Sequence, residues 1–232
     1  MNELILVASM LAHFSLILLA YRFFGKAGLY AMAVFCTVSA NIEVMILVRA
    51  FGLDQTLGNI LFACTFVITD ILSENHSKKD ANKAAKIAVF VTAAFMITTQ
   101  SWLLYTPAAE DTVMGAVRTL FSNTPRVMLS SLAVCALTQL FDVWLYHRVW
   151  NFTSKKFGDS KKFLWLRNNI ATLTSQLINA VLFTLGAFAG VYSIPVLISV
   201  TASSYVIFAV VALCDTPIVY LARKIKARYD IS

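Results

Sequence analysis

Four carboxylates lie inside or at the ends of long apolar segments of this 232-residue chain: Glu43, Asp70, Asp142 and Asp215. An ionised side chain near the centre of a membrane helix costs about 2.5–3.5 kcal/mol even on the most permissive scale. A chain that keeps several such groups is expected to use them on a polar path, where carboxylates bind cations, carry protons or accept hydrogen bonds from a solute. Transport of a polar solute is therefore the first hypothesis.

The composition indicates the same membrane setting. Hydrophobic residues make up 59% of the chain, charged residues 13%, and the mean hydropathy is +0.75. This leaves too little polar surface to cover a water-soluble globule. Backbone groups in lipid must form their hydrogen bonds within their own segment. We therefore expect an all-α integral membrane protein, with residues 1–232 forming one polytopic helical-bundle domain.

Seven apolar segments are long enough to cross a bilayer, for which about 20 residues are needed. Basic residues follow the first, third, fifth and seventh segments, whereas the other connections are neutral or acidic. Under the positive-inside rule this alternation predicts an N-terminus outside and a C-terminus in the cytoplasm. A six-span alternative would place one basic flank on the wrong side. The candidate spans are 3–22, 28–50, 57–74, 85–105, 126–149, 168–189 and 194–222.

The net charge of +7 follows from this topology. Nearly all of the excess lies in the predicted cytoplasmic loops, including the run 155–162, where basic residues meet anionic lipid. We therefore expect membrane lipid as the partner of these charges, and no nucleic acid.

No enzyme motif accompanies the carboxylates. The sequence has no GxSxG, HExxH or Walker motif, and its eight glycines form no phosphate-binding loop. The four cysteines are isolated from one another, which argues against disulfides and against a zinc site. We expect no catalytic activity, no cofactor and no metal.

Helical spacing indicates which polar residues share a face. Asp70 and Glu74 stand four residues apart and therefore lie on one side of their helix. Two like charges at this spacing need a proton, a cation or a basic residue between them, unless Glu74 has already reached water. Gln139 and Asp142 share a face of the fifth span in the same way. Asp70, Asp142 and Asp215 are also 72 and 73 residues apart, which is either a faint internal repeat or a coincidence.

The sixth span is polar along one stripe, because Asn168, Thr172, Gln176 and Asn179 follow one another at steps of four, four and three residues. Amides at this spacing either bind a polar solute or hold helices together by hydrogen bonds, and the sequence leaves both readings open.

The longest outer loop, 106–125, has an amphipathic pattern of its own. Val113, Val117, Leu120 and Phe121 recur at helical spacing after two acidic residues. The pattern predicts a short helix at the interface, either as a cover for the bundle or as an external lid.

Four segments resemble the queuosine precursor transporter family, also called the vitamin uptake transporter group. They are TDILSE at 69–74, QLFDVWL at 139–145, LWLRNN at 164–169 and DTP at 215–217, and the resemblance extends from residue 25 through 223. The chain departs from the family pattern at His76 and Ser77, where relatives usually carry tyrosine and glycine, and at Asn179, where many carry an acid.

The resemblance implies a multi-pass transporter of the inner membrane that imports 7-deazaguanines, namely preQ0, preQ1 or queuine, for tRNA modification. A guanine-like edge presents N1–H and N2–H₂ donors that one carboxylate can accept together, while its O6 accepts from an amide or arginine. The aminomethyl compound preQ1 also carries a positive charge that a second carboxylate would meet.

The predicted substrate-binding residues are mainly acids and amides, with one aromatic side chain to stack on the base, although a lipid-facing role also explains that tryptophan. They are Asp142, Gln139, Gln176, Asn179, Asn169, Asn168, Asn41 and Trp144. A second set is predicted to gate the path or couple it to protons: Asp70, Glu74, Arg126, Arg167, Asp215 and Glu43.

Two other functions stay open on the sequence. The main alternative is a substrate-binding S-component of an energy-coupling factor transporter, which depends on a separate ATPase pair. Ala8 and Ala12 give the small-residue spacing that suits such docking, although it is common in membrane helices. The more distant alternative is a membrane enzyme. The sequence does not distinguish a monomer from a homodimer, and it does not show the driving force.

Overall fold

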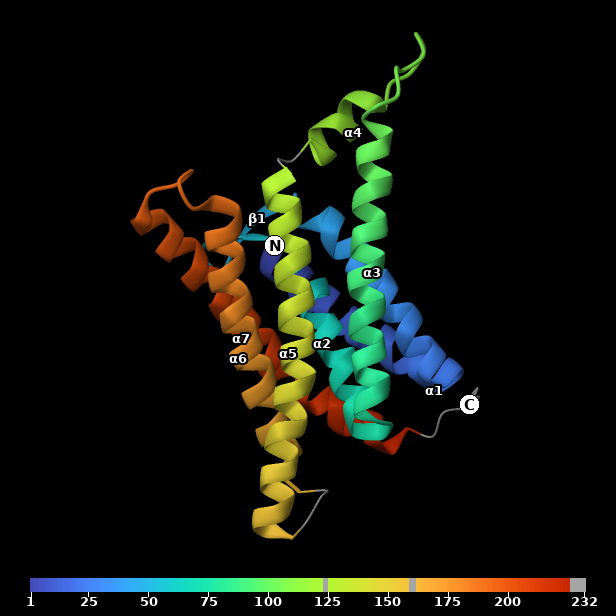
Figure 1. The fold of residues 1–232 in the computed structure, drawn as a ribbon, viewed down its shortest axis with the longest axis vertical. Helices are drawn as coiled ribbons and strands as arrows, with labels where there is room; N and C mark the ends of the chain where they lie inside the picture. The colour runs from blue at the N-terminus through green and yellow to red at the C-terminus, as the bar shows by residue number, and fades with distance from the viewer. Residues whose placement is uncertain (123–124, 159–161, 226–232) are drawn as a thin grey trace.

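The computed structural model describes residues 1–122, 125–158 and 162–225, and within them the chain is mainly helical (Figure 1). The helices are α1 (Asn2–Glu43), α2 (Gly58–Asn75), α3 (Lys78–Trp102), α4 (Met114–Phe121), α5 (Pro125–Phe157), α6 (Leu164–Phe188) and α7 (Ile194–Lys224). The strands β1 (Leu47–Ala50) and β2 (Leu53–Thr56) form a hairpin between α1 and α2.

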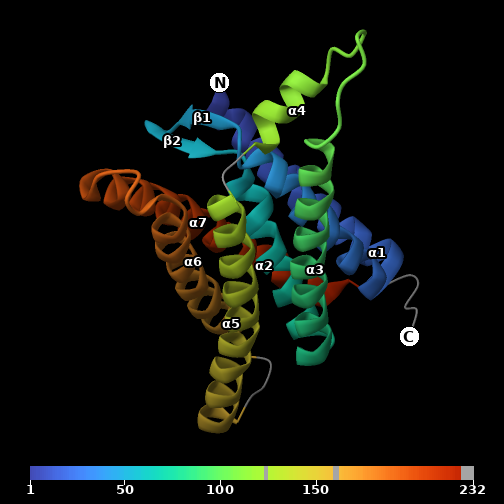
Figure 2. The same ribbon diagram turned by 45° about the horizontal axis from the view of Figure 1, so that its top comes forward.

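Helix α1 contains the first two predicted spans, folded back on each other at Gly25. This residue has φ 58° and ψ −138°, which glycine adopts more readily than residues with a side chain. The Asn2 side chain donates a hydrogen bond of 2.9 Å to the Arg49 carbonyl, so the start of α1 lies beside the segment that follows its end. Figure 2 shows the N-terminus next to β1. The 42 residues of α1 therefore form a helical hairpin.

The second span is shorter than predicted. Its helix ends at Glu43, and residues 47–50, which were expected to be helical, pair with β2 in an antiparallel hairpin. The turn between the strands has positive φ at both Phe51 (54°) and Gly52 (75°), the conformation that two-residue hairpins favour. The polar groups of this segment thus lie in a small sheet at the end of the bundle, outside the helix.

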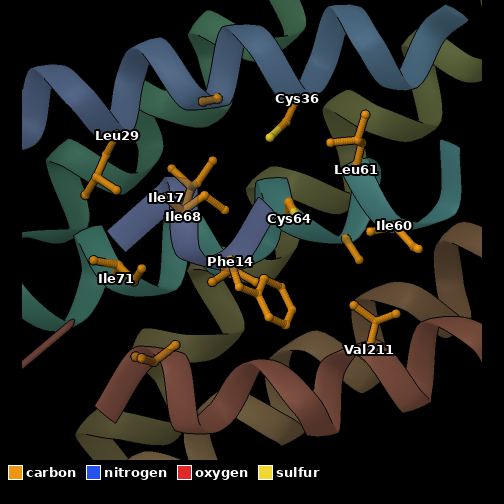
Figure 3. Packing of buried hydrophobic residues seen from close by; sticks show 14 of the residues in the cluster. Phe14, Ile17, Leu29, Cys36, Ile60, Leu61, Cys64, Ile68, Ile71 and Val211 are labelled. Carbon is orange, nitrogen blue, oxygen red and sulfur yellow. The ribbon is translucent and has the colours of Figure 1, made fainter. Parts of the chain in front are cut away.

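Helix α2 is the most enclosed helix, since α1, α3, α5 and α7 all pack against it. Figure 3 shows the apolar part of this packing. There Cys36 of α1 lies opposite Cys64 of α2, and Val211 of α7 approaches from the other side. Because α2 sits inside the bundle, its polar side chains are shielded from lipid by the other helices.

Within the described residues, five helices are long and apolar enough to span a membrane: α1, α3, α5, α6 and α7. The third predicted span corresponds to α2, which does not reach this hydropathy. Its carboxylates Asp70 and Glu74 and its polar ends reduce its apolar character. The structure therefore supports a multi-pass all-α membrane protein.

The short helix predicted in the outer loop is confirmed as α4. Its start is capped by Asp111, whose carboxylate accepts a hydrogen bond of 2.8 Å from the backbone N–H of Met114. Phe121 at its end packs on Phe95 and Trp102 of α3, with ring centroids 5.9 and 5.8 Å apart. Helix α4 thus lies over one end of α3 (Figure 1).

Candidate functional site

Three aspartates from three helices meet inside the bundle. Asp70 of α2, Asp142 of α5 and Asp215 of α7 are each 0% exposed. Asp70 lies close enough to both of the others for their charges to interact, and Asp215 lies within range of Asp142. Three carboxylates that are 72 and 73 residues apart in the sequence are therefore neighbours in the bundle.

The three carboxylates differ in their hydrogen bonding. Thr172 of α6 donates to Asp70 Oδ2 at 3.1 Å, and Asn168 donates to Asp215 Oδ1 at 2.8 Å. The second oxygen of each, and both oxygens of Asp142, have no hydrogen-bond partner within the described residues. A buried polar atom without a partner costs about 1–3 kcal/mol and is rare in folded proteins. Four carboxylate oxygens are thus available for a ligand or a proton.

Buried amides from α5 and α6 surround these acids. Gln139 donates to Thr65 of α2, so this amide connects two helices, and its Oε1 has no partner in the described part of the chain. Gln176 is 0% exposed, and neither its Oε1 nor its Nε2 has a partner there. It follows Thr172 by one helical turn and therefore points from the same face of α6 as the side chain that bonds Asp70.

The amides of the sixth span differ in whether they join helices or remain free to bind a solute. Asn168 connects α6 to α7 through Asp215 and through Thr216, at 3.2 Å. Gln176 makes no such connection among the described residues, so it is the amide best suited to bind a solute. Asn179 is also buried, at 8% exposure.

Glu74 lies one turn beyond Asp70, and it is not in water. Its side chain is 3% exposed and accepts hydrogen bonds from Arg167 Nε (3.0 Å), from Arg223 Nε (2.6 Å) and from the Tyr146 hydroxyl (2.6 Å). The alternative that Glu74 has reached solvent is therefore wrong. Both basic partners, Arg167 and Arg223, are bonded to Glu74 and not to Asp70, which stands four residues away.

Arg167 is buried and makes both hydrogen bonds and an aromatic contact. It is 0% exposed, its guanidinium carbon lies 4.1 Å from the centroid of the Trp150 ring, and its Nη1 donates to the Lys162 carbonyl at 2.9 Å. A buried arginine is tolerated when its donors are used and an aromatic face covers it. Trp150 and Arg223 were not among the predicted site residues. Their position at the same predicted end of the bundle as Glu74 was the feature of the sequence that could have indicated them.

Three predicted residues make none of the hydrogen bonds described above. Asn41 donates to Thr37 of its own helix at 2.8 Å, and Glu43 is the last residue of α1. Trp144 is 49% exposed and packs on Phe141 at the outer surface of α5. Trp144 is two residues from Asp142, so helical geometry directs the two side chains to nearly opposite faces. The stacking role expected for Trp144 is therefore corrected.

Two further predicted residues lie at helix ends. Arg126 is exposed, and its guanidinium donates to the carbonyls of Gly186 (2.8 Å) and Ala189 (2.7 Å), where the last carbonyls of α6 lack helical partners. Asn169 is half-buried and donates to Thr216 at 2.8 Å. The first contact joins α5 to α6, and the second joins α6 to α7.

Helices that span a membrane, arranged around an enclosed centre of acids and amides, define the class of multi-pass membrane transport proteins. The chain belongs to the family described as "Putative vitamin uptake transporter", whose model matches residues 56–222. It is also 36% identical to a "Probable queuosine precursor transporter" of Bacillus subtilis (strain 168) over 212 residues, which cover 91% of this chain and 90% of the relative. No solved structure is significantly similar to the chain.

These comparisons confirm the resemblance read from the sequence segments. The matched range, 56–222, contains the three aspartates, Glu74 and Arg167, whereas Asn41 and Glu43 precede it. The part of the chain that defines the family thus coincides with the polar centre seen in the structure.

Proposed function

We propose that this chain imports queuosine precursors, the 7-deazaguanines, across the cell (inner) membrane. The observation that carries the proposal is the enclosed centre in which Asp142 and Gln176 keep donors and acceptors without partners in the described residues. The name of the Bacillus subtilis relative, a probable queuosine precursor transporter, supports the substrate class. No observation on the described residues specifically favours the main alternative, an S-component, or the more distant one, an enzyme.

The unpartnered atoms complement a guanine-like base. Both oxygens of Asp142 accept hydrogen bonds from the N1–H and N2–H₂ donors of the base, which need two acceptors side by side. The Gln176 amide nitrogen donates to O6, and Gln139 Oε1, which also lacks a partner in the described residues, supplies a further acceptor. Asn179, three residues after Gln176, is assigned to the same site. Asn168 and Asn169 position Asp215 and Thr216 rather than contacting the base directly.

The proposed topology has seven spans, with the N-terminus outside and the C-terminus in the cytoplasm. The two halves of α1 supply two spans, and α2, α3, α5, α6 and α7 supply the others, in one domain over 1–232. The basic starts and ends of α3 (Lys78), α5 (Lys155) and α7 (Lys224) lie at the end of the bundle away from α4 (Figure 1), as the positive-inside rule requires of a cytoplasmic face. Reporter fusions at the two termini test this orientation.

The cytoplasmic end is proposed to be closed by Glu74, Arg167 and Arg223. One carboxylate bonded by two arginines joins α2, α6 and α7, so opening of this end requires these bonds to break. Asp70 stands one helical turn before Glu74 on α2, and its charge interacts with Glu74 and with the other two aspartates. Arg126 is proposed to hold the opposite ends of α5 and α6 together in the same state.

Uptake by cells that cannot make the precursors tests the proposal. Each 7-deazaguanine is supplied separately, and queuosine in tRNA is measured with and without this chain. Restored queuosine is the expected result, and the absence of restoration by every compound would show that the proposal is wrong. Copurification of an ATPase pair, with uptake only in its presence, would replace it with the S-component reading. Recovery of chemically altered substrate would indicate an enzyme.

A further inference from the structure

We infer that the central site selects a substrate that carries a positively charged amine, with Asp70 as the counter-charge of that amine. On this inference preQ1, which bears an aminomethyl group, binds more tightly than preQ0, which bears a neutral nitrile at the same position. The inference rests on the proposed function and specifies its substrate.

The charge balance of the buried centre is the first argument. Asp70, Asp142 and Asp215 are fully buried, and the hydrogen bonds that the described residues make to them come from neutral Thr172 and Asn168. Arg167, which is fully buried, and Arg223, which is 25% exposed, are bonded to Glu74. Within the described residues, the three buried aspartates therefore have no charged hydrogen-bond partner.

A neutral base would leave most of this negative charge uncompensated. The guanine-like edge needs one carboxylate, and it brings no charge of its own. A buried carboxylate is stabilised when it meets a cation with hydrogen-bond geometry, and such charge-assisted bonds are about twice as strong as neutral ones. A substrate with an ammonium group supplies both the missing charge and the donors.

The carboxylate oxygens without a partner indicate which aspartate binds which part of the substrate. Asp142 has two unpartnered oxygens in the described part of the chain, which suits the paired donors of the base edge. Asp70 and Asp215 each have one bonded oxygen and one without a partner there, which suits a single ammonium group. Asp70 is assigned this role because its partner Thr172 lies one turn from Gln176 on the same face of α6. Asp70 also interacts with both other aspartates, so a cation beside it is attracted by all three carboxylates. Asp215 accepts a hydrogen bond from Asn168, which also donates to the neighbouring Thr216.

An independent feature marks this cluster as a ligand site. Gln176 is 0% exposed and carries a donor and an acceptor that no described residue satisfies. It projects from the face of α6 that also carries Thr172, one turn away, and Thr172 bonds Asp70. Ser175, its neighbour in sequence, lies near Asp142, although neither side chain makes a hydrogen bond within the described residues. The amide therefore lies beside the acids and needs a partner that the described residues do not supply.

The test compares preQ1 and preQ0 on the purified full-length protein, in binding measurements and in uptake. We expect wild-type protein to bind preQ1 at least about tenfold more tightly than preQ0, as one charge-assisted bond gives. The variant Asp70→Asn should lose this preference by weakening preQ1 at least about tenfold while preQ0 binding stays within about twofold. The variant Asp142→Asn should weaken both compounds, and Glu110→Gln, on the exposed outer loop, should change neither.

Equal affinity of the wild type for the two compounds, or an equal loss of both in Asp70→Asn, would overturn the inference. Because preQ0 binding reports on folding, it serves as the internal control, and Asp70→Glu should restore the preference for preQ1. If Asp70→Asn does not fold, the wild-type ratio still decides. A wild type that binds neither compound, and that does not bind queuine either, would instead contradict the proposed function.

Discussion

Arg167 on α6 donates hydrogen bonds of 2.7 and 2.6 Å to the two oxygens of Glu74 on α2, although 93 residues separate them. The two side chains are 0% and 3% exposed. Tyr146 of α5 and Arg223 of α7 bond the same carboxylate. Four helices are therefore held together at one end of the bundle by a single acidic group.

Removing one partner of this pair should destabilise the protein strongly. The variant Arg167→Gln leaves Glu74 buried with one arginine fewer, and breaking a buried ion pair costs about 3–5 kcal/mol. We expect a lower thermal denaturation midpoint in detergent than for Lys155→Gln, which removes an exposed charge at the end of α5. The double variant Glu74→Gln/Arg167→Gln should recover part of the loss. Additive losses in the double variant would contradict direct coupling of the two residues.

Neutralising Asp142 should abolish efficient uptake without unfolding the protein. Asp142→Asn keeps the shape of the side chain but replaces an acceptor oxygen by a donor, which conflicts with the N1–H and N2–H₂ groups of the base. The loss of hydrogen bonds to a charged group corresponds to about a 10- to 100-fold higher substrate KM. Radiolabelled precursor uptake at matched expression measures this. Normal import by a well-expressed Asp142→Asn protein would exclude Asp142 from the binding site.

Replacing Gln176 should reduce transport without reducing the stability of the protein. Because neither amide atom has a partner in the described residues, replacing it by leucine removes two unsatisfied polar groups. We expect Gln176→Leu to unfold at the same temperature as the wild type or higher, while uptake falls at least about tenfold. Gln139→Leu is the matched comparison, since it breaks an existing bond to Thr65 and should lower stability. A destabilised Gln176→Leu protein with normal uptake would favour a purely structural role for this amide.

The sequence predicted the membrane class and the helix in the outer loop, because apolar length and helical spacing are local properties. It did not predict that Glu74 is enclosed, since its partners Arg167 and Arg223 come from distant helices. The stacking role predicted for Trp144 is also wrong. A tryptophan near Asp142 suggested stacking on the base, whereas helical geometry directs its side chain outward.

The fold of α1 depended on a contact that spacing alone does not reveal. A Cβ atom on Gly28 would clash with the Ala20 carbonyl oxygen, so the two halves of α1 approach through this glycine. We expect Gly28→Ala to lower the free energy of unfolding by about 1–3 kcal/mol, as overpacking does. Gly115→Ala in α4 meets nothing within 4 Å and should be neutral or slightly stabilising, because alanine is the better helix former. Fluorescence-detected size-exclusion after heating measures both variants. A Gly28→Ala protein as stable as Gly115→Ala would mean that the halves of α1 do not pack this closely.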